Sequence, residues 1–281
     1  MTIPTPNLYG LMIAIGIYLA ITISEKAQLK LSRKNSIYQS IQIEKLIVWI
    51  ALPAILGARA YHVIDFWEYY WLNPQEIIVI WQGGIGIFGA ILGGLAGIAL
   101  YTWKKTPRQT NQLHYFLSIT DLASVGIPVA QAIGRLGNYF NQELFGRPTD
   151  LPWGIFIDPK NRPPQHLDSS HFHPLFAYES LLNIIVFIIL WNTIVTVTNS
   201  SKTKNAKDIA ITAPPISKYK ILGSTLIGIP TAIYLIGYGL IRFCLEYLRI
   251  DPWNIGFITT GQLFSLGLIT LGILIIQFRR S

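Results

Sequence analysis

The chain has 281 residues, of which 51% are hydrophobic and only 13% are charged. Soluble domains carry about 25% charged residues, so this deficit indicates a polytopic membrane protein. The formal net charge of +8 does not indicate nucleic-acid binding, because the basic residues lie in short blocks between apolar runs. The single cysteine, Cys244, excludes an internal disulfide framework and a metal site built from cysteines. The first residues do not have the pattern of a removable signal peptide.

Seven apolar runs are long enough to be membrane-spanning helices. A helix needs about 17–25 residues to cross ~30 Å of hydrocarbon, where its backbone must be hydrogen-bonded internally. The predicted fold class is therefore all-α, a bundle of seven transmembrane helices in one domain over residues 1–281. The third run is interrupted at Gly83-Gly84, which favours a short interfacial helix ahead of the span. The predicted spans are residues 8–24, 46–64, 76–103, 113–138, 175–197, 221–248 and 257–278.

The positions of lysine and arginine predict the orientation in the membrane. Fifteen of the 22 basic residues follow the first, third, fifth and seventh spans. Because cytoplasmic loops carry the excess of basic residues, we expect the N-terminus outside and the C-terminus inside. Residues 139–174, rich in aromatic residues and prolines, then form an outer lobe that rests on the bilayer. Residues 198–220 are rich in Asn, Ser, Thr and Lys and are expected to be a cytoplasmic linker.

Polar side chains interrupt two spans at depths where an unpaired charge is costly. Residues 134–146 read Gly-Arg-Leu-Gly-Asn-Tyr-Phe-Asn-Gln-Glu-Leu-Phe-Gly and bring an arginine, three amides and a carboxylate to the outer surface. In the sixth span, four polar residues recur every three or four positions, so they share one helix face. Such a face points to the bundle interior or to a wet cavity, and a purely internal ion pair is the alternative. The four residues are Tyr238, Arg242, Glu246 and Arg249.

The block at 134–146 closely resembles the signature of the prolipoprotein diacylglyceryl transferases, bacterial enzymes that move the diacylglyceryl group of phosphatidylglycerol onto a lipoprotein cysteine. The resemblance runs from Tyr9 to Gln262 and is strongest at 134–146 and 237–249. It implies a transferase of the bacterial cytoplasmic (inner) membrane that forms a thioether at the lipobox cysteine and releases glycerol phosphate. The implied partners are phosphatidylglycerol, prolipoprotein signal peptides and membrane lipids. No cofactor, metal or nucleic acid is expected.

The resemblance also implies the site residues. Arginine suits an anionic phosphodiester because its planar fork binds phosphate in a bidentate way. For Tyr9 the alternative is an interfacial anchor, and for Arg59 a side chain that snorkels to the headgroups. The implied catalytic residues are Arg135, Arg242, Glu143, Tyr9 and Tyr238. The implied substrate-binding residues are Arg135, Asn138, Arg242, Glu246, Gly146 and Arg59.

One position departs from the family pattern. The family motif begins His-Gly-Gly or a near variant, and this chain reads Phe88-Gly89-Ala90. The family histidine is assigned as proton acceptor, and phenylalanine cannot accept a proton. We expect an active enzyme in which the field of the arginines, a carboxylate such as Glu143, or His62 replaces that base. The alternatives are an inactive paralogue and a non-catalytic lipid-binding transporter or scramblase.

Two further features inside the spans are expected to be structural. Gly89, Gly93 and Gly97 recur every four residues, which lets a neighbouring helix approach closely. Asp121 lies in the middle of the fourth span, where a carboxylate must be protonated or paired. A structural hydrogen bond between Asp121 and a neighbouring helix is favoured over a catalytic role.

The start of the fifth span also resembles the family, in its His-Pro-x-x-x-Tyr-Glu pattern from His173 to Glu179. His173 is expected to make hydrogen bonds to the outer lobe. Glu179 lies at membrane depth and is expected to pair with an arginine. Gly261-Gln262, at the start of the seventh span, is interpreted as a packing motif.

Overall fold

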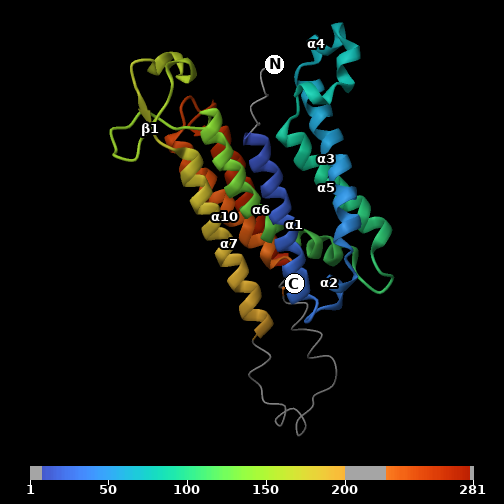
Figure 1. Cartoon of the computed structure of the whole chain (residues 1–281). Coiled ribbons are helices and arrows are strands. Elements are labelled where there is room, and N and C mark those ends of the chain that lie inside the picture. The colour runs from blue at the N-terminus through green and yellow to red at the C-terminus, as the bar shows by residue number, and fades with distance from the viewer. Residues whose placement is uncertain (1–7, 200–225, 279–281) are drawn as a thin grey trace, which may run out of the picture. The chain divides into compact units, whose positions relative to one another are not determined.

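The computed structural model describes residues 8–199 and 226–278. Within them, seven helices are long and apolar enough to cross a membrane, which confirms the predicted all-α, seven-span class. Residues 200–225, which include most of the predicted linker at 198–220, lie outside the described part of the chain. The seven helices, drawn in Figure 1, are α1 (Leu8–Leu31), α3 (Ile43–Asp65), α5 (Ile87–Lys105), α6 (Gln112–Asn141), α7 (Leu175–Asn199), α10 (Ile229–Leu245) and α11 (Thr260–Phe278).

The third span shows the largest difference from its predicted bounds. Residues 74–82 form two 3₁₀ turns, η1 (Pro74–Ile78) and η2 (Ile80–Gln82), instead of the first part of a long helix. Gly83 and Gly84 follow with φ angles of 95° and 72°, a region that side chains with a Cβ rarely adopt. These two glycines separate the turns from α5, so the predicted interruption is confirmed.

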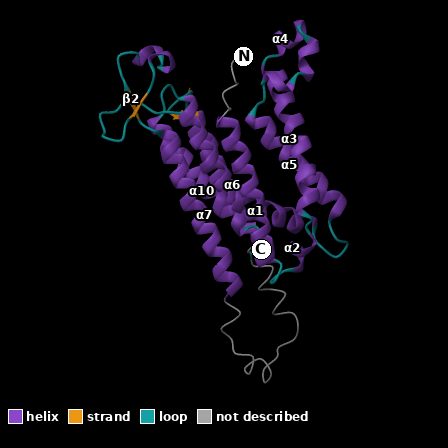
Figure 2. Ribbon diagram, viewed as in Figure 1, coloured by secondary structure: helices purple, strands orange, loops and turns teal. Residues whose placement is uncertain are grey.

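The chain divides into two compact units, residues 1–35 with 120–281, and residues 36–119. Figure 2 shows that helices make up most of both units. The expectation of a single domain over residues 1–281 stays a prediction. The functional side chains expected from the sequence fall mainly in the first unit, with Arg59 and Phe88 in the second.

The second unit is built on the close packing of α3 against α5. It also contains the short helices α2 (Ser36–Ser40) and α4 (Trp67–Leu72). The three glycines spaced by four residues face α3, where their missing side chains let the two backbones touch, as predicted from the sequence. A Cβ atom at Gly89, Gly93 or Gly97 would overlap the carbonyl oxygen of Gly57, Pro53 or Trp49, respectively.

In the first unit, α1 packs against α6 and α7, and α10 packs against α7 and α11.

A carboxylate fixes the start of α10. Asp121 of α6 is fully buried, and its two oxygens accept hydrogen bonds from the Gly228 N–H at 2.8 Å, the Thr231 N–H at 3.0 Å and the Thr231 hydroxyl at 2.7 Å. The first N–H groups of a helix lack partners within it, and the helix dipole favours a negative charge there. Asp121 therefore caps α10 from another helix, which confirms its predicted structural role.

Residues 142–174, called the lobe below, connect α6 to α7. The lobe was predicted to begin near residue 139, but α6 continues to Asn141 because its last turn stays hydrogen-bonded. Two short strands, β1 (Ile155–Phe156) and β2 (His171–Phe172), pair antiparallel with Ile155 opposite Phe172. Ile157 and Phe172 are 1% and 0% exposed and form the small apolar core of the lobe. The remaining short elements of this unit are η3 (Pro159–Asn161), η4 (Pro164–His166), η5 (Glu246–Leu248), β3 (Asn254–Ile255) and β4 (Ile258–Thr259).

Candidate active site

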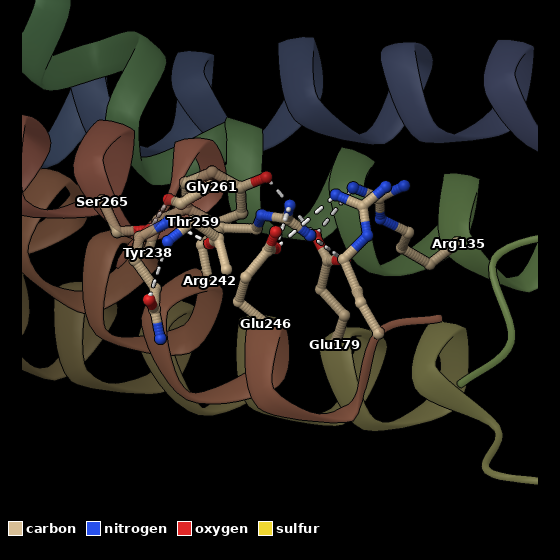
Figure 3. Close-up of polar contacts among 10 residues, drawn as sticks. Arg135, Glu179, Tyr238, Arg242, Glu246, Thr259, Gly261 and Ser265 are labelled. Carbon is tan, nitrogen blue, oxygen red and sulfur yellow. Dashed lines mark hydrogen bonds and ion pairs between the residues drawn. The ribbon is translucent and has the colours of Figure 1, made fainter. Parts of the chain in front are cut away.

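Glu179, on the first turn of α7, links three helices of the first unit. Its Oε1 atom lies 2.8 Å from Nη2 of Arg135 on α6 and accepts a hydrogen bond from the Tyr238 hydroxyl of α10 at 3.4 Å. Its Oε2 atom lies 4.0 Å from Nη1 of Arg242, also on α10. Figure 3 shows the side chains of Arg135, Glu179 and Arg242 pointing toward one another from three helices. The predicted pairing of Glu179 with an arginine is therefore confirmed, and its partners come from α6 and α10.

Glu246 forms the second acidic centre. Its side chain is 1% exposed, and its Oε2 atom lies 3.1 Å from Arg242 Nη2 and 3.5 Å from Arg249 Nη1. The close approach of α11 depends on Gly261, because a Cβ atom there would overlap the Glu246 carboxylate. The chain turns into α11 where Gln262 and Thr259 exchange hydrogen bonds, Gln262 N–H to Thr259 Oγ1 at 3.0 Å and Thr259 N–H to Gln262 Oε1 at 3.1 Å. Gly261-Gln262 is thus a packing motif, as predicted, and the group it packs against is a site carboxylate.

These contacts join five charged residues into one ionic network. Three are arginines and two are carboxylates, so the network carries one positive charge in excess. Charged groups at membrane depth are costly unless they are paired, and an unbalanced network is therefore a functional signal. Its members are Arg135, Arg242, Arg249, Glu179 and Glu246.

A cavity of about 290 Å³ opens beside the network. Its charged lining residues are Glu179, Arg242, Arg249 and Asp251. The Asp251 carboxylate accepts a hydrogen bond from the Gln165 amide of the lobe. The combination of an arginine-lined wall with apolar surfaces suits an amphiphilic anion. The apolar lining consists of Leu144, Phe145, Pro163, Leu175, Leu245 and Ile250.

The turn after α6 places the predicted Glu143 next to the predicted Asn138. The Asn138 and Asn141 amides donate hydrogen bonds to Glu143 Oε1 at 2.8 Å and 3.1 Å. Asn138 is 3% exposed, whereas Glu143 is exposed. Gly146 ends the turn, where its N–H donates to His173 O at 2.8 Å and a Cβ atom would lie only 2.7 Å from Leu248 O. Gly146 is therefore required for close packing of the turn, and the substrate-binding role implied for it stays a prediction.

Gln142 is a site residue that the sequence did not reveal. Gln142 and Leu144, on either side of Glu143, have φ angles of 49° and 54°, a conformation that costs energy for residues other than glycine. The Gln142 Oε1 atom accepts hydrogen bonds from the Asp158 N–H and the Asn161 side-chain amide, both at 2.9 Å. These lobe contacts hold the turn in its strained shape, and no local sequence pattern could have indicated them.

Tyr9 of α1 lies against the same block of α6. A Cβ atom at Gly137 would lie 2.9 Å from Cδ2 of the Tyr9 ring, so the absence of a side chain at Gly137 makes room for that ring. Tyr9 therefore contacts the helical part of the block at residues 134–146. Its proposed hydrogen-bonding role stays a prediction.

A second polar cluster fastens the lobe to α7. The Tyr178 hydroxyl accepts a hydrogen bond from Trp153 Nε1 at 2.7 Å and lies 3.1 Å from His173 Nδ1. The His173 N–H also donates to Arg147 O at 3.0 Å. The predicted bonding of His173 to the lobe is confirmed.

Arg59, in the second unit, is 8% exposed. Its guanidinium donates to the carbonyl oxygens of Ile77 at 2.8 Å, Gly83 at 3.0 Å and Gly84 at 2.9 Å, and also to that of Glu76. Every guanidinium nitrogen is therefore engaged with the backbone of residues 76–84, and Arg59 anchors that segment to α3. The substrate-binding role implied by the resemblance stays a prediction.

Phe88 and His62 also belong to the second unit. Phe88 is the second residue of α5 and is 49% exposed, and its ring centroid lies 6.0 Å from that of Tyr61. The His62 ring lies 4.6 Å from the ring of Phe66 and 5.8 Å from that of Tyr70. His62 thus packs among aromatic rings, and its role as a replacement base stays a prediction. Among the residues that the structure describes, no group of three His, Cys, Asp or Glu side chains could hold a metal ion.

Seven apolar helices, and an arginine–carboxylate network that joins α6, α7 and α10, define a polytopic membrane protein with a polar site at membrane depth. A sequence model of the family described as prolipoprotein diacylglyceryl transferase matches residues 3–213 and 216–278. The chain belongs to the prolipoprotein diacylglyceryl transferase family.

Its relatives include three bacterial proteins named phosphatidylglycerol–prolipoprotein diacylglyceryl transferase. That of Synechococcus elongatus is 37% identical over 266 residues, covering 95% of this chain and 81% of the relative. That of Thermosynechococcus vestitus is 35% identical over 264 residues, covering 94% and 85%. That of Fervidobacterium nodosum is 36% identical over 266 residues, covering 94% and 78%. The similarity extends over nearly the whole chain and favours the transferase over the alternatives considered from the sequence.

Proposed function

We propose that this protein transfers the diacylglyceryl group of phosphatidylglycerol to the lipobox cysteine of prolipoproteins. The cysteine sulfur attacks the glyceryl carbon that bears the phosphate, a carbon–sulfur bond forms, and the carbon–oxygen bond to phosphate breaks. The products are a thioether-linked diacylglyceryl protein and glycerol phosphate. The acceptor peptide supplies the nucleophile, so the enzyme needs only to bind, orient and stabilise charge.

The observation that carries this proposal is the ionic network with one excess positive charge beside a partly apolar cavity. A phosphodiester carries one negative charge, and its lipid has apolar chains that suit the cavity walls. Arg242 and Arg249 line the cavity and can each present guanidinium donors to phosphate oxygens. Charge grows on the leaving phosphate as the carbon–oxygen bond breaks, and fixed arginines stabilise it.

The other residues expected from the sequence take supporting roles. The ion pair of Arg135 with Glu179 holds the Arg135 guanidinium near Arg242. Asn138 orients Glu143 in the turn after α6. Tyr238 donates to Glu179, and Tyr9 lies against Gly137 of α6. We assign the two tyrosines to positioning the arginines and the headgroup.

The proton of the acceptor thiol needs a destination other than residue 88. A free thiol has a pKa of about 8.5, so some thiolate exists at neutral pH, and nearby arginines increase that fraction. Glu143 is exposed in the turn after α6. We propose that its carboxylate accepts the proton. His62 is the weaker candidate because its ring packs against Phe66 and Tyr70.

We further propose that the protein lies in the bacterial cytoplasmic membrane with its N-terminus outside. The distribution of lysines and arginines supports this orientation, since 15 of 22 follow the odd-numbered spans. The lobe would then face outward, where exported prolipoproteins arrive. A reporter fused after Ser281 should be cytoplasmic, and an extracytoplasmic reporter would overturn the orientation.

The test of the function is a transfer assay with purified protein. Vesicles of phosphatidylglycerol and a synthetic lipobox peptide are incubated with the protein, and the peptide mass is read. We expect a mass increase equal to one diacylglyceryl group on the cysteine. Vesicles that contain only phosphatidylcholine, and a peptide with serine in place of cysteine, should give no product. If the intact protein gives no product under any condition, the proposal fails.

A further inference from the structure

Beneath the ionic network lies a second polar layer that the proposed chemistry does not use. Three helices each contribute a pair of residues four positions apart, which places the two members of a pair one above the other on one helix face. The upper members are Arg135, Glu179 and Tyr238, which contact one another. The lower members, called the polar floor below, are Gln131, Asn183 and Tyr234.

The directions of the helices put the three lower residues at the same end of the network. The lobe connects the end of α6 to the start of α7, and α10 ends toward the site at Leu245. Gln131 therefore precedes Arg135 on α6, Asn183 follows Glu179 on α7, and each lies one turn farther from the lobe. The Ser180 hydroxyl donates to Ala132 O at 2.8 Å, which fixes the register of α6 and α7 between the two layers.

Tyr234 completes the polar floor from α10. Its ring stacks on that of Tyr238, with centroids 5.9 Å apart and planes 11° apart. One member of the polar floor is thus in contact with the layer above.

Asn183 is the member with unmet hydrogen bonds. It is 0% exposed, and neither its Oδ1 nor its Nδ2 atom has a hydrogen-bond partner. The Oε1 atom of Gln131 is likewise buried and unbonded. Buried polar groups in proteins are almost always satisfied, and an exception calls for an explanation such as a bound water molecule.

We propose that the polar floor is a site for ordered water, held between Asn183, Gln131 and Tyr234 inside the helix bundle. An internal water needs two to four polar partners, and the Asn183 amide, the Gln131 carbonyl and the Tyr234 hydroxyl supply them. The buried amide can both donate to water and accept from it. A lipid acyl chain cannot meet these groups, and the hydroxyl of Ser180, three residues before Asn183 on α7, donates to Ala132 O.

The water site also has a consequence for the ionic network. Water one turn below Glu179 offers hydrogen bonds and a polarisable medium to a carboxylate that is 6% exposed. It supports the stacked ring of Tyr238 from below through Tyr234. Asn183 is therefore a positioning residue for the network. This second step rests on the proposed transferase function, whereas the water site itself does not.

The water site is tested by radiolytic hydroxyl-radical labelling of the intact protein in detergent, read by mass spectrometry. Radicals form from water, so an internal water labels the side chains beside it. We expect oxidation of Tyr234 in the wild-type protein and a severalfold decrease in the Asn183→Leu variant. The Asn192→Leu variant changes an exposed asparagine of the same helix and should label like the wild type. Unlabelled Tyr234 in the wild type, or unchanged labelling in Asn183→Leu, overturns the water site.

Thermal unfolding separates the water site from a dry, unsatisfied amide. If water satisfies the hydrogen bonds of Asn183, replacement by leucine removes that water. Gln131 and Tyr234 then lose it as a hydrogen-bond partner, and the Tm falls. If the amide is dry and unbonded, its removal relieves a cost and the Tm rises, which overturns the proposal. Should the variant fail to fold, an experimental structure of the wild type decides the question. Density for water between Asn183 and Gln131 supports the site, and a direct bond between the two amides overturns it.

The positioning role is tested in the transfer assay. A misplacement of reacting groups by about 1 Å can cost about 100-fold in rate. We expect Asn183→Leu to lower kcat by about 10- to 100-fold with little change in KM for phosphatidylglycerol vesicles. A wild-type kcat in this variant removes the positioning role and leaves the water site standing. Absence of transfer by the wild type would instead count against the proposed function, because the labelling experiment does not depend on activity.

Discussion

Arg135 and Glu179 are 44 residues apart in the chain and 2.8 Å apart in the structure. Their ion pair joins α6 to α7, and the Tyr238 hydroxyl adds α10 to the same carboxylate oxygen. The Glu179 side chain is 6% exposed, whereas that of Arg135 is 25% exposed. The carboxylate is thus the buried anchor, and the guanidinium keeps surface available for a ligand.

Replacement of Arg135 or Arg242 by alanine should nearly abolish transfer. Each change removes a guanidinium from the ionic network and leaves Glu179 with one arginine fewer. Loss of one partner of a buried pair costs about 3–5 kcal/mol, so both variants should also unfold at a lower temperature. The lysine variants keep the charge without the bidentate fork and should recover only part of the activity. Transfer and thermal unfolding are measured together, and a normal rate in either alanine variant would remove that arginine from the phosphate site.

The packing of Gly261 against Glu246 predicts a strong effect of a single methyl group. In Gly261→Ala the new Cβ would overlap the Glu246 carboxylate, which must move away from Arg242 and Arg249. We expect transfer to fall by more than about tenfold, the factor that corresponds to about 1.4 kcal/mol of lost transition-state stabilisation. Gly267→Ala is the matched control, because it lies on the same helix with no atom within 4 Å of the added Cβ. Equal activity of the two variants would show that the position of Glu246 is unimportant.

Gln142 offers a way to separate backbone strain from side-chain contacts. Gln142→Gly relieves the positive φ and removes both hydrogen bonds to the lobe, whereas Gln142→Ala keeps the strain and removes the same bonds. We expect transfer to fall in both variants, and the alanine variant to be less stable by about 1 kcal/mol. Gln142→Glu retains an oxygen that can accept from Asp158 and Asn161, so it should keep more activity than either. Wild-type activity in Gln142→Ala would contradict a role for the lobe in holding the turn.

Phe88→His restores the residue type that the family motif has at this position. Because we propose that proton transfer does not depend on residue 88, the variant should be as active as the wild type or more active. General base catalysis contributes about 10²–10⁴-fold, which bounds any gain. The wild-type rate should rise steeply with pH as the acceptor thiol ionises near its pKa of about 8.5. Thioether formed only by the variant, with none from the wild type at any pH, would establish the inactive-paralogue alternative.

Sequence alone determined the class of this protein and named most of the residues expected at its site. Seven apolar runs of sufficient length identified the spans, because hydrophobicity and helical periodicity are local properties of a chain. The family motifs singled out Arg135, Arg242 and Glu246, and the cost of charge at membrane depth indicated that Glu179 pairs with an arginine.

Only the tertiary structure decided which groups meet. Glu179 could have paired with any arginine near the membrane surface, and the packing of α6, α7 and α10 selected Arg135 and Arg242. The capping of α10 by Asp121 and the packing of Gly261 against Glu246 also join residues of different helices. Such contacts depend on how several helices pack at once, and no local period in the sequence encodes them. The strained turn at Gln142 needs the folded lobe to hold it, for the same reason.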